Sequence, residues 1–246
     1  MAKLRQGNGN GPAPAVRADA RAIIEKLNGR VPKERTVINH QPGVSTTVNV
    51  RTPVILRPHP VAWAIPTDEV LFARFFTNFL QLRMMPWDDL YTAGSTYLPD
   101  ARNILHKFFV EESKSPHLLM LDSDVLPPPD FLMRLLEHDK PMVGGWYRKK
   151  GDPYPPCVYD YVNTTEDGVN HWRGRTEAGR GLEQVDGAGA GCWLMRRDVA
   201  VALGPKPYSM SEGGEDMTLC RKVTALGFPM FIDWSVACAH CGVAYT

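Results

Sequence analysis

The chain has 246 residues, of which 43% are hydrophobic and 22% charged, with a formal net charge of +1. This composition excludes a disordered or fibrous chain and suffices for one domain with a full apolar core. No apolar run is long enough to cross a membrane and the polar N-terminus does not resemble an export signal, so we expect a soluble cytoplasmic protein. Five cysteines, an odd number, then indicate free thiols.

Charge is distributed unevenly along the chain. Residues 1–60 hold 10 Lys/Arg against 3 Asp/Glu, whereas the remainder holds 18 against 24. We therefore predict a basic N-terminal extension, residues 1–60, that is partly disordered or arm-like, and one domain over residues 61–246. The extension contains a helical pattern at residues 17–28. It is either a solvated arm or a contact for nucleic acid, an acidic partner or a second copy of the chain.

A strand and a helix open the body. Residues 61–67 are apolar up to Pro66, which ends the strand, and a helix is predicted over residues 69–83. Its predicted inner face consists of Val70, Leu71, Phe75, Phe79 and Leu82. A strand that passes quickly into a helix is the start of an α/β unit.

A polar connection leads to the second predicted helix. Residues 84–99 link the two helices and form a short strand at Tyr91 and Thr92. The helix covers residues 101–112 until Pro116 breaks the pattern. Its predicted inner face consists of Ile104, Leu105, Phe108 and Phe109.

The most informative stretch is the apolar run 118–121, followed by Asp122, Ser123 and Asp124. Such a run indicates a strand buried on both faces, and it ends at the acidic pair because Asp is a poor strand former. Ligands of open α/β sheets bind beyond these strand ends. Two carboxylates there repel each other unless a cation intervenes, and hard oxygen ligands suit Mg²⁺ or Mn²⁺ bound to phosphates. The stretch predicts a metal–diphosphate site; alternatively, Asp122 caps a turn and Asp124 begins a loop.

A helix over residues 131–136 and a strand over residues 141–147 follow. We expect residues 148–183 to form a long loop or small hairpin over the site, because long loops in compact domains are often functional. The glycine-rich residues 185–191 then lead into a strand. They are either a tight turn or a floor of small residues beneath a sugar.

Glu215 and Asp216 open the last predicted helix, which ends at Gly227. The helix dipole explains one carboxylate at this position, but not a cluster of them. A final strand over residues 228–237 is followed by His240, which is either structural or a ligand.

In this order, the segments resemble the GT-A glycosyltransferases, in particular bacterial and phage-type members related to family 2. The resemblance covers residues 61–243, and residues 1–60 have no counterpart. The matching motifs are Ala64-Ile65-Pro66-Thr67, Leu121-Asp122-Ser123-Asp124-Val125 as the DxD motif, Gly191-Cys192-Trp193-Leu194-Met195, Gly214-Glu215-Asp216 as the ED motif, and His240. They imply an α/β fold of the GT-A type, with a Rossmann-like mixed, mainly parallel sheet and helices on both faces.

The resemblance implies a metal-dependent hexosyltransferase that uses a nucleotide-sugar donor, a UDP-sugar being favoured, in a bacterium or phage-infected cell. The implied donor-binding residues are Pro66 and Thr67 at the nucleobase, Arg102 near the base or diphosphate, Asp122 at the ribose or metal, Ser123, and Gly191 beneath the sugar. Asp124 and His240 would ligate Mn²⁺ or Mg²⁺, with Asp122 as a further candidate.

The implied chemistry is an inverting transfer, which needs a base for the acceptor hydroxyl. Asp216 is the first candidate for this base and Glu215 the second. Trp146 would stack on the base or sugar, unless it is a buried core residue.

Other functions remain open at this point. A nucleotidyltransferase of related fold, or a non-catalytic module that binds nucleotide-sugar or glycan, would use similar residues. A phosphatase of the haloacid-dehalogenase type is disfavoured because Leu126 stands where it would need Thr. The acceptor could be a protein, a glycan, a lipid-linked carrier or modified DNA.

Overall fold

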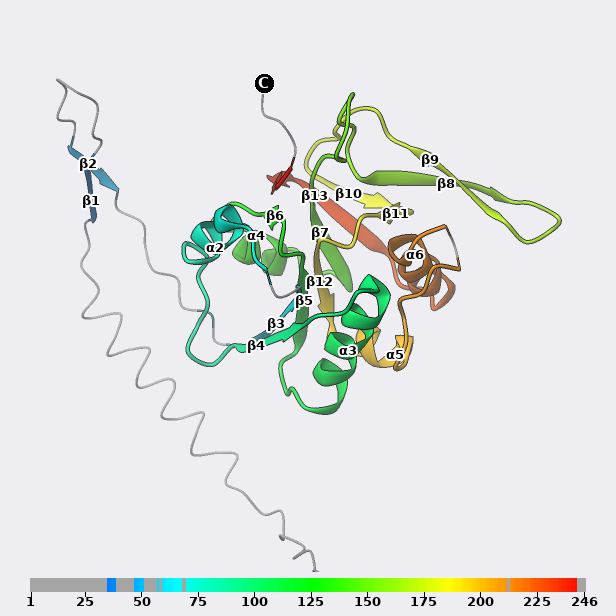
Figure 1. Cartoon of the computed structure of the whole chain (residues 1–246), viewed down its shortest axis with the longest axis horizontal. Coiled ribbons are helices and arrows are strands. Elements are labelled where there is room, and N and C mark those ends of the chain that lie inside the picture. The colour runs from blue at the N-terminus through cyan, green and yellow to red at the C-terminus, as the bar shows by residue number, and fades with distance from the viewer. Residues whose placement is uncertain are drawn as a thin grey trace, which may run out of the picture. The chain divides into compact units, whose positions relative to one another are not determined.

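The computed structural model describes residues 35–38, 47–50, 57, 59–67, 70–211 and 213–242 (Figure 1). The chain divides into two compact units, Met1–Pro58 and His59–Thr246. In the first unit, β1 (Arg35–Ile38) and β2 (Thr47–Val50) pair antiparallel. The helix predicted over residues 17–28 lies outside the described residues.

The second unit is built on a seven-stranded sheet in the order β10-β13-β7-β12-β5-β3-β4. The strands are β3 (Val61–Pro66), β4 (Asp89–Ala93), β5 (His117–Leu121), β7 (Met142–Trp146), β10 (Leu182–Val185), β12 (Cys192–Arg196) and β13 (Met230–Ala237). All run in one direction except β12 and β10. Because β3, β4 and β5 are parallel neighbours, their carboxyl ends meet at one edge of the sheet, where such folds bind ligands.

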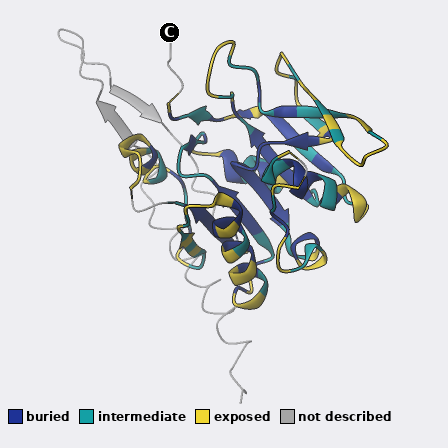
Figure 2. Ribbon diagram, turned by 45° about the vertical axis from the view of Figure 1, so that its right-hand side comes forward, coloured by how far each residue is buried: buried dark blue, intermediate teal, exposed yellow. Residues whose placement is uncertain are grey.

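Helices cover both faces of this sheet. On one face α3 (Leu98–Glu111), α5 (Arg197–Leu203) and α6 (Glu215–Ala225) contribute to one apolar cluster; on the other, α2 (Ala73–Phe79) and α4 (Phe131–Glu137) contribute to a second. Figure 2 shows the central strands as an almost continuous buried layer. The predicted fold class, a mixed and mainly parallel α/β sheet between helices, is confirmed.

The first helix of the body is shorter than predicted. It spans Ala73–Phe79 rather than residues 69–83, and residues 68 and 69 lie outside the described part of the chain. Phe75 and Leu82 are buried as expected, but Val70 is 81% and Leu71 44% exposed, so the prediction that these two face the core is wrong. Without apolar surface to pack on, and without a side-chain cap, an earlier turn gains little stability.

The second helix turns a different side toward the sheet than predicted. Leu105 and Phe109 are fully buried, but Ile104 and Phe108 are exposed. The prediction that Ile104 and Phe108 point inward is therefore wrong. The positions beside the apolar pair are taken by Arg102 and His106, which are also buried. A charged side chain occupies the core face because it has partners there, as described below.

The long segment after β7 contains a hairpin. β8 (Val158–Thr164) and β9 (Asn170–Gly174) pair antiparallel and protrude from the body (Figure 1), and β11 (Gly187–Ala188) pairs with β8. A smaller two-stranded ladder joins β6 (Val125–Leu126) to β14 (Ala239–His240). This ladder brings the C-terminal His240 to the strand end of β5.

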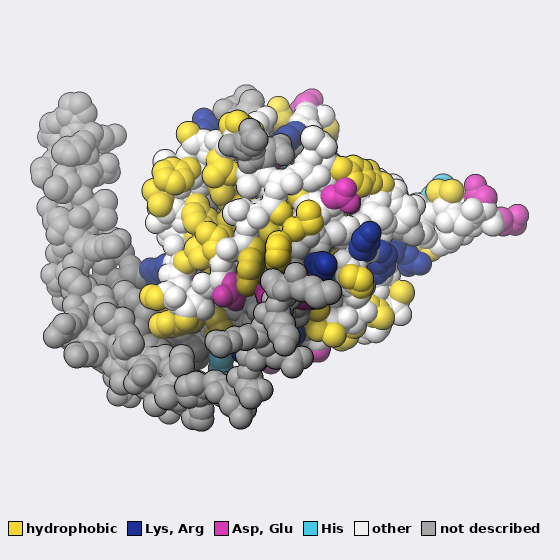
Figure 3. All heavy atoms as spheres, turned by 60° about the horizontal axis from the view of Figure 1, so that its bottom comes forward, with side chains coloured by type: hydrophobic (Ala, Val, Ile, Leu, Met, Phe, Trp, Pro, Cys, Tyr) yellow, Lys and Arg dark blue, Asp and Glu magenta, His cyan; other side chains and the backbone are white. Residues whose placement is uncertain are grey.

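On the face of the body seen in Figure 3, hydrophobic side chains are spread among polar ones, and several Lys and Arg side chains are grouped near the root of the protruding hairpin. Among the described residues, no helix combines the length and the apolar character that a membrane crossing requires.

Candidate functional site

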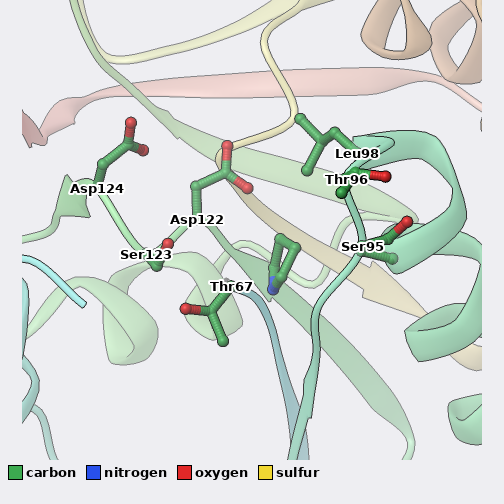
Figure 4. A pocket seen from close by; sticks show the side chains of 9 residues that line it. Thr67, Ser95, Thr96, Leu98, Asp122, Ser123 and Asp124 are labelled. Carbon is green, nitrogen blue, oxygen red and sulfur yellow. The ribbon is translucent and has the colours of Figure 1, made fainter. Parts of the chain in front are cut away.

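The carboxyl ends of β3 and β5 border an open cavity of about 290 Å³. Its lining is Pro66, Thr67, Ser95, Thr96, Leu98, Ala101, Asp122, Ser123 and Asp124. In Figure 4, Asp124 lies at one end of the cavity and Ser95, Thr96 and Leu98 lie at the other. The cavity therefore has a hydroxyl-lined end and an acidic end.

Asp122 is held from two sides. Its backbone N–H donates to the carbonyl of Gly191 at 2.9 Å, and Arg102 Nη2 donates to its Oδ2 at 2.9 Å. The carbonyl of Asp122 also accepts from Val125 N–H at 3.1 Å, so a turn does follow the strand. The side chain, however, pairs with Arg102 instead of capping this turn. Burial raises the pKa of Asp122, and the Arg102 guanidinium opposes this effect.

Gly191 is the small residue that this arrangement requires. A Cβ atom there would lie 2.9 Å from the Tyr147 hydroxyl oxygen and 3.0 Å from Asp122 Oδ2. The backbone N–H of Gly191 donates to that hydroxyl at 3.0 Å. A larger residue would push Asp122 or Tyr147 out of position. Gly191 thus supports the acidic motif, in addition to any contact with a ligand.

Asp124 faces two nitrogen atoms. Lys150 Nζ lies 2.6 Å and His240 Nε2 3.4 Å from its Oδ2. Burial alone would raise the pKa of Asp124, but hydrogen bonds and charge from His240 and Lys150 lower it to about 2. Asp124 is therefore an ionised carboxylate near neutral pH. The ladder between β6 and β14 places His240 beside it.

Glu215 and Asp216 form the first turn of α6. Glu215 Oε1 lies 3.8 Å from Arg102 Nε, so Arg102 connects the ED pair to Asp122. Burial, and after it the neighbouring Glu215 carboxyl, raise the pKa of Asp216 to about 7 against the opposing effect of Arg102. Within the described residues, the buried atoms Asp122 Oδ1, Asp216 Oδ1 and Arg102 Nε have no hydrogen-bond partner. Unpaired buried polar atoms are costly and are expected where a ligand completes a site.

The structure brings together most of the predicted site residues. Pro66, Thr67, Asp122, Ser123 and Asp124 line the cavity, and His240 contacts Asp124. Glu215 and Asp216 are not part of the lining: Glu215 lies beside Arg102, which pairs with Asp122, and Asp216 is the next residue of α6.

Three predicted donor-binding residues, Arg102, Trp146 and Gly191, are not part of the cavity lining. The Arg102 side chain is only 2% exposed and is engaged by Asp122 and by the carbonyl of Ala190. Trp146 donates from Nε1 to the carbonyl of Trp234 at 2.9 Å, and its ring packs on the ring of Trp234. Arg102 therefore positions acidic groups, and Trp146 belongs to the packing around β13.

Sequence reasoning missed Ser95, Thr96, Leu98 and Ala101, which line one end of the cavity. They follow β4, whose full length, Asp89–Ala93, is parallel to β3. The signal was present, because a parallel neighbour of β3 must end at the same edge of the sheet. It was weak because only Tyr91 and Thr92 indicate a strand there.

Asp124 and His240 offer one oxygen and one nitrogen donor, so a divalent ion held there would need further ligands from water or substrate. No group of three or more His, Cys, Asp or Glu side chains within the described ranges is placed to hold a metal ion. Mg²⁺ in proteins commonly has one or two carboxylates, with water and substrate phosphates completing its shell. Two ligands about 2.1 Å from one ion and at right angles lie roughly 3 Å apart, near the 3.4 Å between His240 Nε2 and Asp124 Oδ2.

The tautomer of His240 suits this use. Its Nδ1 lies 2.8 Å from the carbonyl oxygen of Arg148, which can only accept a hydrogen bond. We therefore assign a proton to Nδ1, which leaves Nε2, the nitrogen beside Asp124, as the ring atom that could ligate an ion. A backbone carbonyl that orients an imidazole in this way is typical of the second shell of metal sites.

The strand order, the flanking helices and the acidic motif after β5 define a class of fold, the GT-A-like α/β fold. Among solved structures, A197 from STIV matches with a TM-score of 0.55 and 17% identity, over 74% of this chain and 85% of that chain. GalNAc-T7, crystallised with UDP, GalNAc and Mn²⁺, matches with a TM-score of 0.52 and 10% identity. That match covers 76% of this chain and 45% of GalNAc-T7.

These likenesses concern the fold alone, because the sequence identities are low. No protein-family model and no curated protein sequence matches the chain.

Proposed function

We propose that this chain is a metal-dependent glycosyltransferase that moves a sugar from a nucleotide-diphosphate donor, a UDP-sugar being favoured, to an acceptor hydroxyl. The observation that carries the proposal is the pairing of Asp124 with His240 at the acidic end of a cavity in a GT-A-like fold. A structural neighbour crystallised with UDP, GalNAc and Mn²⁺ supports this choice of ligands.

The cavity suits a nucleotide at one end and a diphosphate at the other. Thr67, Ser95 and Thr96 offer hydroxyl groups to a base or ribose. At the other end Arg102 and Lys150 are already engaged by Asp122 and Asp124, so we expect a diphosphate to bind there together with a divalent cation. Asp124 and His240 would hold that cation, Mn²⁺ or Mg²⁺, with Asp122 adjacent. When bound, it would stabilise the negative charge that develops on the departing nucleoside diphosphate.

Asp216 is the proposed base of an inverting transfer. A carboxyl group that accepts a proton from a hydroxyl works best when its pKa lies near the operating pH. Burial raises the pKa of Asp216 to about 7, and its Oδ1 has no hydrogen-bond partner among the described residues. Glu215 stands beside it and is turned toward Arg102. We assign Glu215 a supporting role, because it raises the pKa of Asp216.

Incubation with a panel of nucleotide sugars and Mn²⁺, followed by detection of nucleoside diphosphate, tests the proposal. We expect release of UDP from at least one UDP-sugar, loss of release on chelation, and loss in Asp124→Asn. Pyrophosphate as the product would instead indicate a nucleotidyltransferase. Binding of donor without turnover, unchanged in Asp216→Asn, would indicate a binding module.

The acceptor requires a separate experiment. With the donor identified, the same assay with peptides, oligosaccharides, a lipid-linked carrier and hydroxymethylated DNA distinguishes protein, glycan, lipid-linked and modified DNA acceptors. Release that increases with only one of these classes identifies the acceptor. Release that none of them changes indicates hydrolysis of the donor.

A further inference from the structure

The loop of residues 147–157, a short excursion between β7 and β8, reaches the acidic end of the cavity. It is closed at its base by two backbone hydrogen bonds, from Lys149 N–H to the carbonyl of Pro155 at 2.8 Å and from Cys157 N–H to the carbonyl of Tyr147 at 2.9 Å. These bonds fix the position of the lysines that the excursion carries. The fold itself therefore delivers a positive charge to this end of the cavity.

The two adjacent lysines of this loop contact different partners. Lys150 Nζ lies 2.6 Å from Asp124 Oδ2, whereas Lys149 Nζ lies over the ring of Tyr159, 4.5 Å from its centroid. The Lys150 side chain is 48% exposed, so it can leave Asp124 by rotation of its own flexible stem. Lys149 is thus a natural control for Lys150.

The ammonium group sits on the same oxygen that faces His240. Asp124 Oδ2 is shared between Lys150 Nζ at 2.6 Å and His240 Nε2 at 3.4 Å. A divalent ion bound between Asp124 and His240 would have to displace the ammonium group, because two cations on one carboxylate oxygen repel each other. The displaced ammonium could then pair with the proposed diphosphate, whose negative charge rises beyond the two charges of the ion as the nucleoside diphosphate departs.

We propose that Lys150 is the resident counter-ion of the site, which competes with the divalent ion for Asp124 and moves to the donor's diphosphate when the ion and the donor bind together. The proposal rests on the proposed function. It makes Lys150 a positioning residue that weakens the binding of metal alone and couples the binding of metal to that of nucleotide. Such coupling is reciprocal by thermodynamic necessity.

The test is a titration with Mn²⁺, in which free Mn²⁺ is followed by electron paramagnetic resonance, with and without UDP. It compares the wild type with Lys150→Met, which keeps the length of the side chain and removes its charge, and with Lys149→Met as the matched control. Without UDP we expect Lys150→Met to bind Mn²⁺ about tenfold more tightly than the wild type, since a charge-assisted hydrogen bond to Asp124 no longer opposes the ion. Lys149→Met should match the wild type.

UDP should then increase the Mn²⁺ affinity of the wild type by a larger factor than that of Lys150→Met, because the variant has no ammonium group to transfer to the diphosphate. Thermal melting of each variant verifies that it is folded. If Lys150→Met binds Mn²⁺ and the wild type does not bind it measurably, this result supports the proposal equally.

Three results overturn it. If Lys150→Met binds Mn²⁺ as the wild type does or more weakly, while Asp124→Asn abolishes binding, Lys150 is not a competitor and the proposed function stands. If Lys149→Met changes Mn²⁺ affinity as much as Lys150→Met, the effect is one of general surface charge. If none of the proteins binds Mn²⁺ with or without UDP, the metal-dependent function fails together with this inference.

Discussion

Arg102 joins the two acidic parts of the candidate site. It donates to Asp122 Oδ2 at 2.9 Å and to the carbonyl of Ala190 at 3.2 Å, and it lies 3.8 Å from Glu215 Oε1. Burial alone would lower the pKa of Arg102, but the carboxylates of Asp122 and Asp216 raise it above its ordinary value. The guanidinium group is therefore permanently charged, and its removal would leave several carboxyl groups without a counter-charge in a buried place.

Arg102→Met should lower the free energy of unfolding by about 3–5 kcal/mol, the usual effect of removing one partner of a buried ion pair. Urea unfolding measures this as a fall in the midpoint at constant slope. Arg134→Met is the matched control, because Arg134 makes an exposed ion pair with Asp130 at 2.6 Å. Such pairs contribute about 0–1 kcal/mol. Equal losses in the two variants would contradict the role given to Arg102.

Asp216→Asn should lower the rate of transfer by about 10²–10⁴-fold, the range of general base catalysis, and leave UDP affinity unchanged. The base must be ionised to accept a proton. With the pKa of Asp216 at about 7, the wild-type rate should therefore rise with pH through about 7 and level off above it. The pH–rate profile of Asp216→Asn should lack this step. A wild-type profile that is flat between pH 5 and 8 would exclude Asp216 as the base.

The same titration makes a prediction about stability. Folding raises the pKa of Asp216 from its ordinary value of 3.8 to about 7, so between these pH values the folded state binds a proton that the unfolded state has lost. The contribution of Asp216 to stability therefore declines as pH rises from about 4 to about 7. The urea midpoint of the wild type should fall across this pH range. The midpoint of Asp216→Asn should fall less, because the variant lacks the contribution of the Asp216 carboxyl group. A wild-type slope equal to that of the variant would argue against the raised pKa.

At the scale of elements, one face of α3 contributes both Leu105 to the core and Arg102 to the candidate site. Leu105→Ala should cost about 2–5 kcal/mol, the range for deleting a buried leucine side chain. Ile104→Ala, one residue away on the exposed side, should stay within about 0.5 kcal/mol of the wild type. Denaturant unfolding of the pair checks the orientation of the helix. A loss for Ile104→Ala as large as that for Leu105→Ala would mean that both side chains face the core, as the sequence pattern predicted.

How far the sequence determines these elements differs from place to place. The end of β5 at Leu121 is predictable because an apolar run that passes into charged residues marks a strand end, whereas the DxD and ED motifs and His240 were assigned from the resemblance to a known family. The inner face of α3 could not be predicted, because Arg102 is buried by its ion pair with Asp122, which lies 20 residues away in the sequence. The positions of Ser95 and Lys150 could not be predicted either. Both reach the site from connections whose paths depend on the finished sheet.

At the scale of the whole molecule, ligand binding should appear as stabilisation. A ligand that binds only the folded state raises the free energy of unfolding by RT ln(1 + [L]/Kd), about 2.7 kcal/mol at a hundredfold excess over Kd. We expect the melting temperature to rise most with UDP and Mn²⁺ together, and little with either alone, because Lys150 is held by Asp124 until an ion replaces it there. An equal shift with UDP in the presence of a chelator would contradict this coupling.

The Asp124–His240 pair offers one oxygen and one nitrogen atom. A site of this kind ranks first-row ions by the Irving–Williams order, in which copper, nickel and zinc bind more tightly than manganese. The ion found in the purified protein would then depend on which metals the expression host contains. It need not be the ion that sustains turnover. Preparations from different growth media would differ in activity until they are stripped and reloaded with a single defined metal.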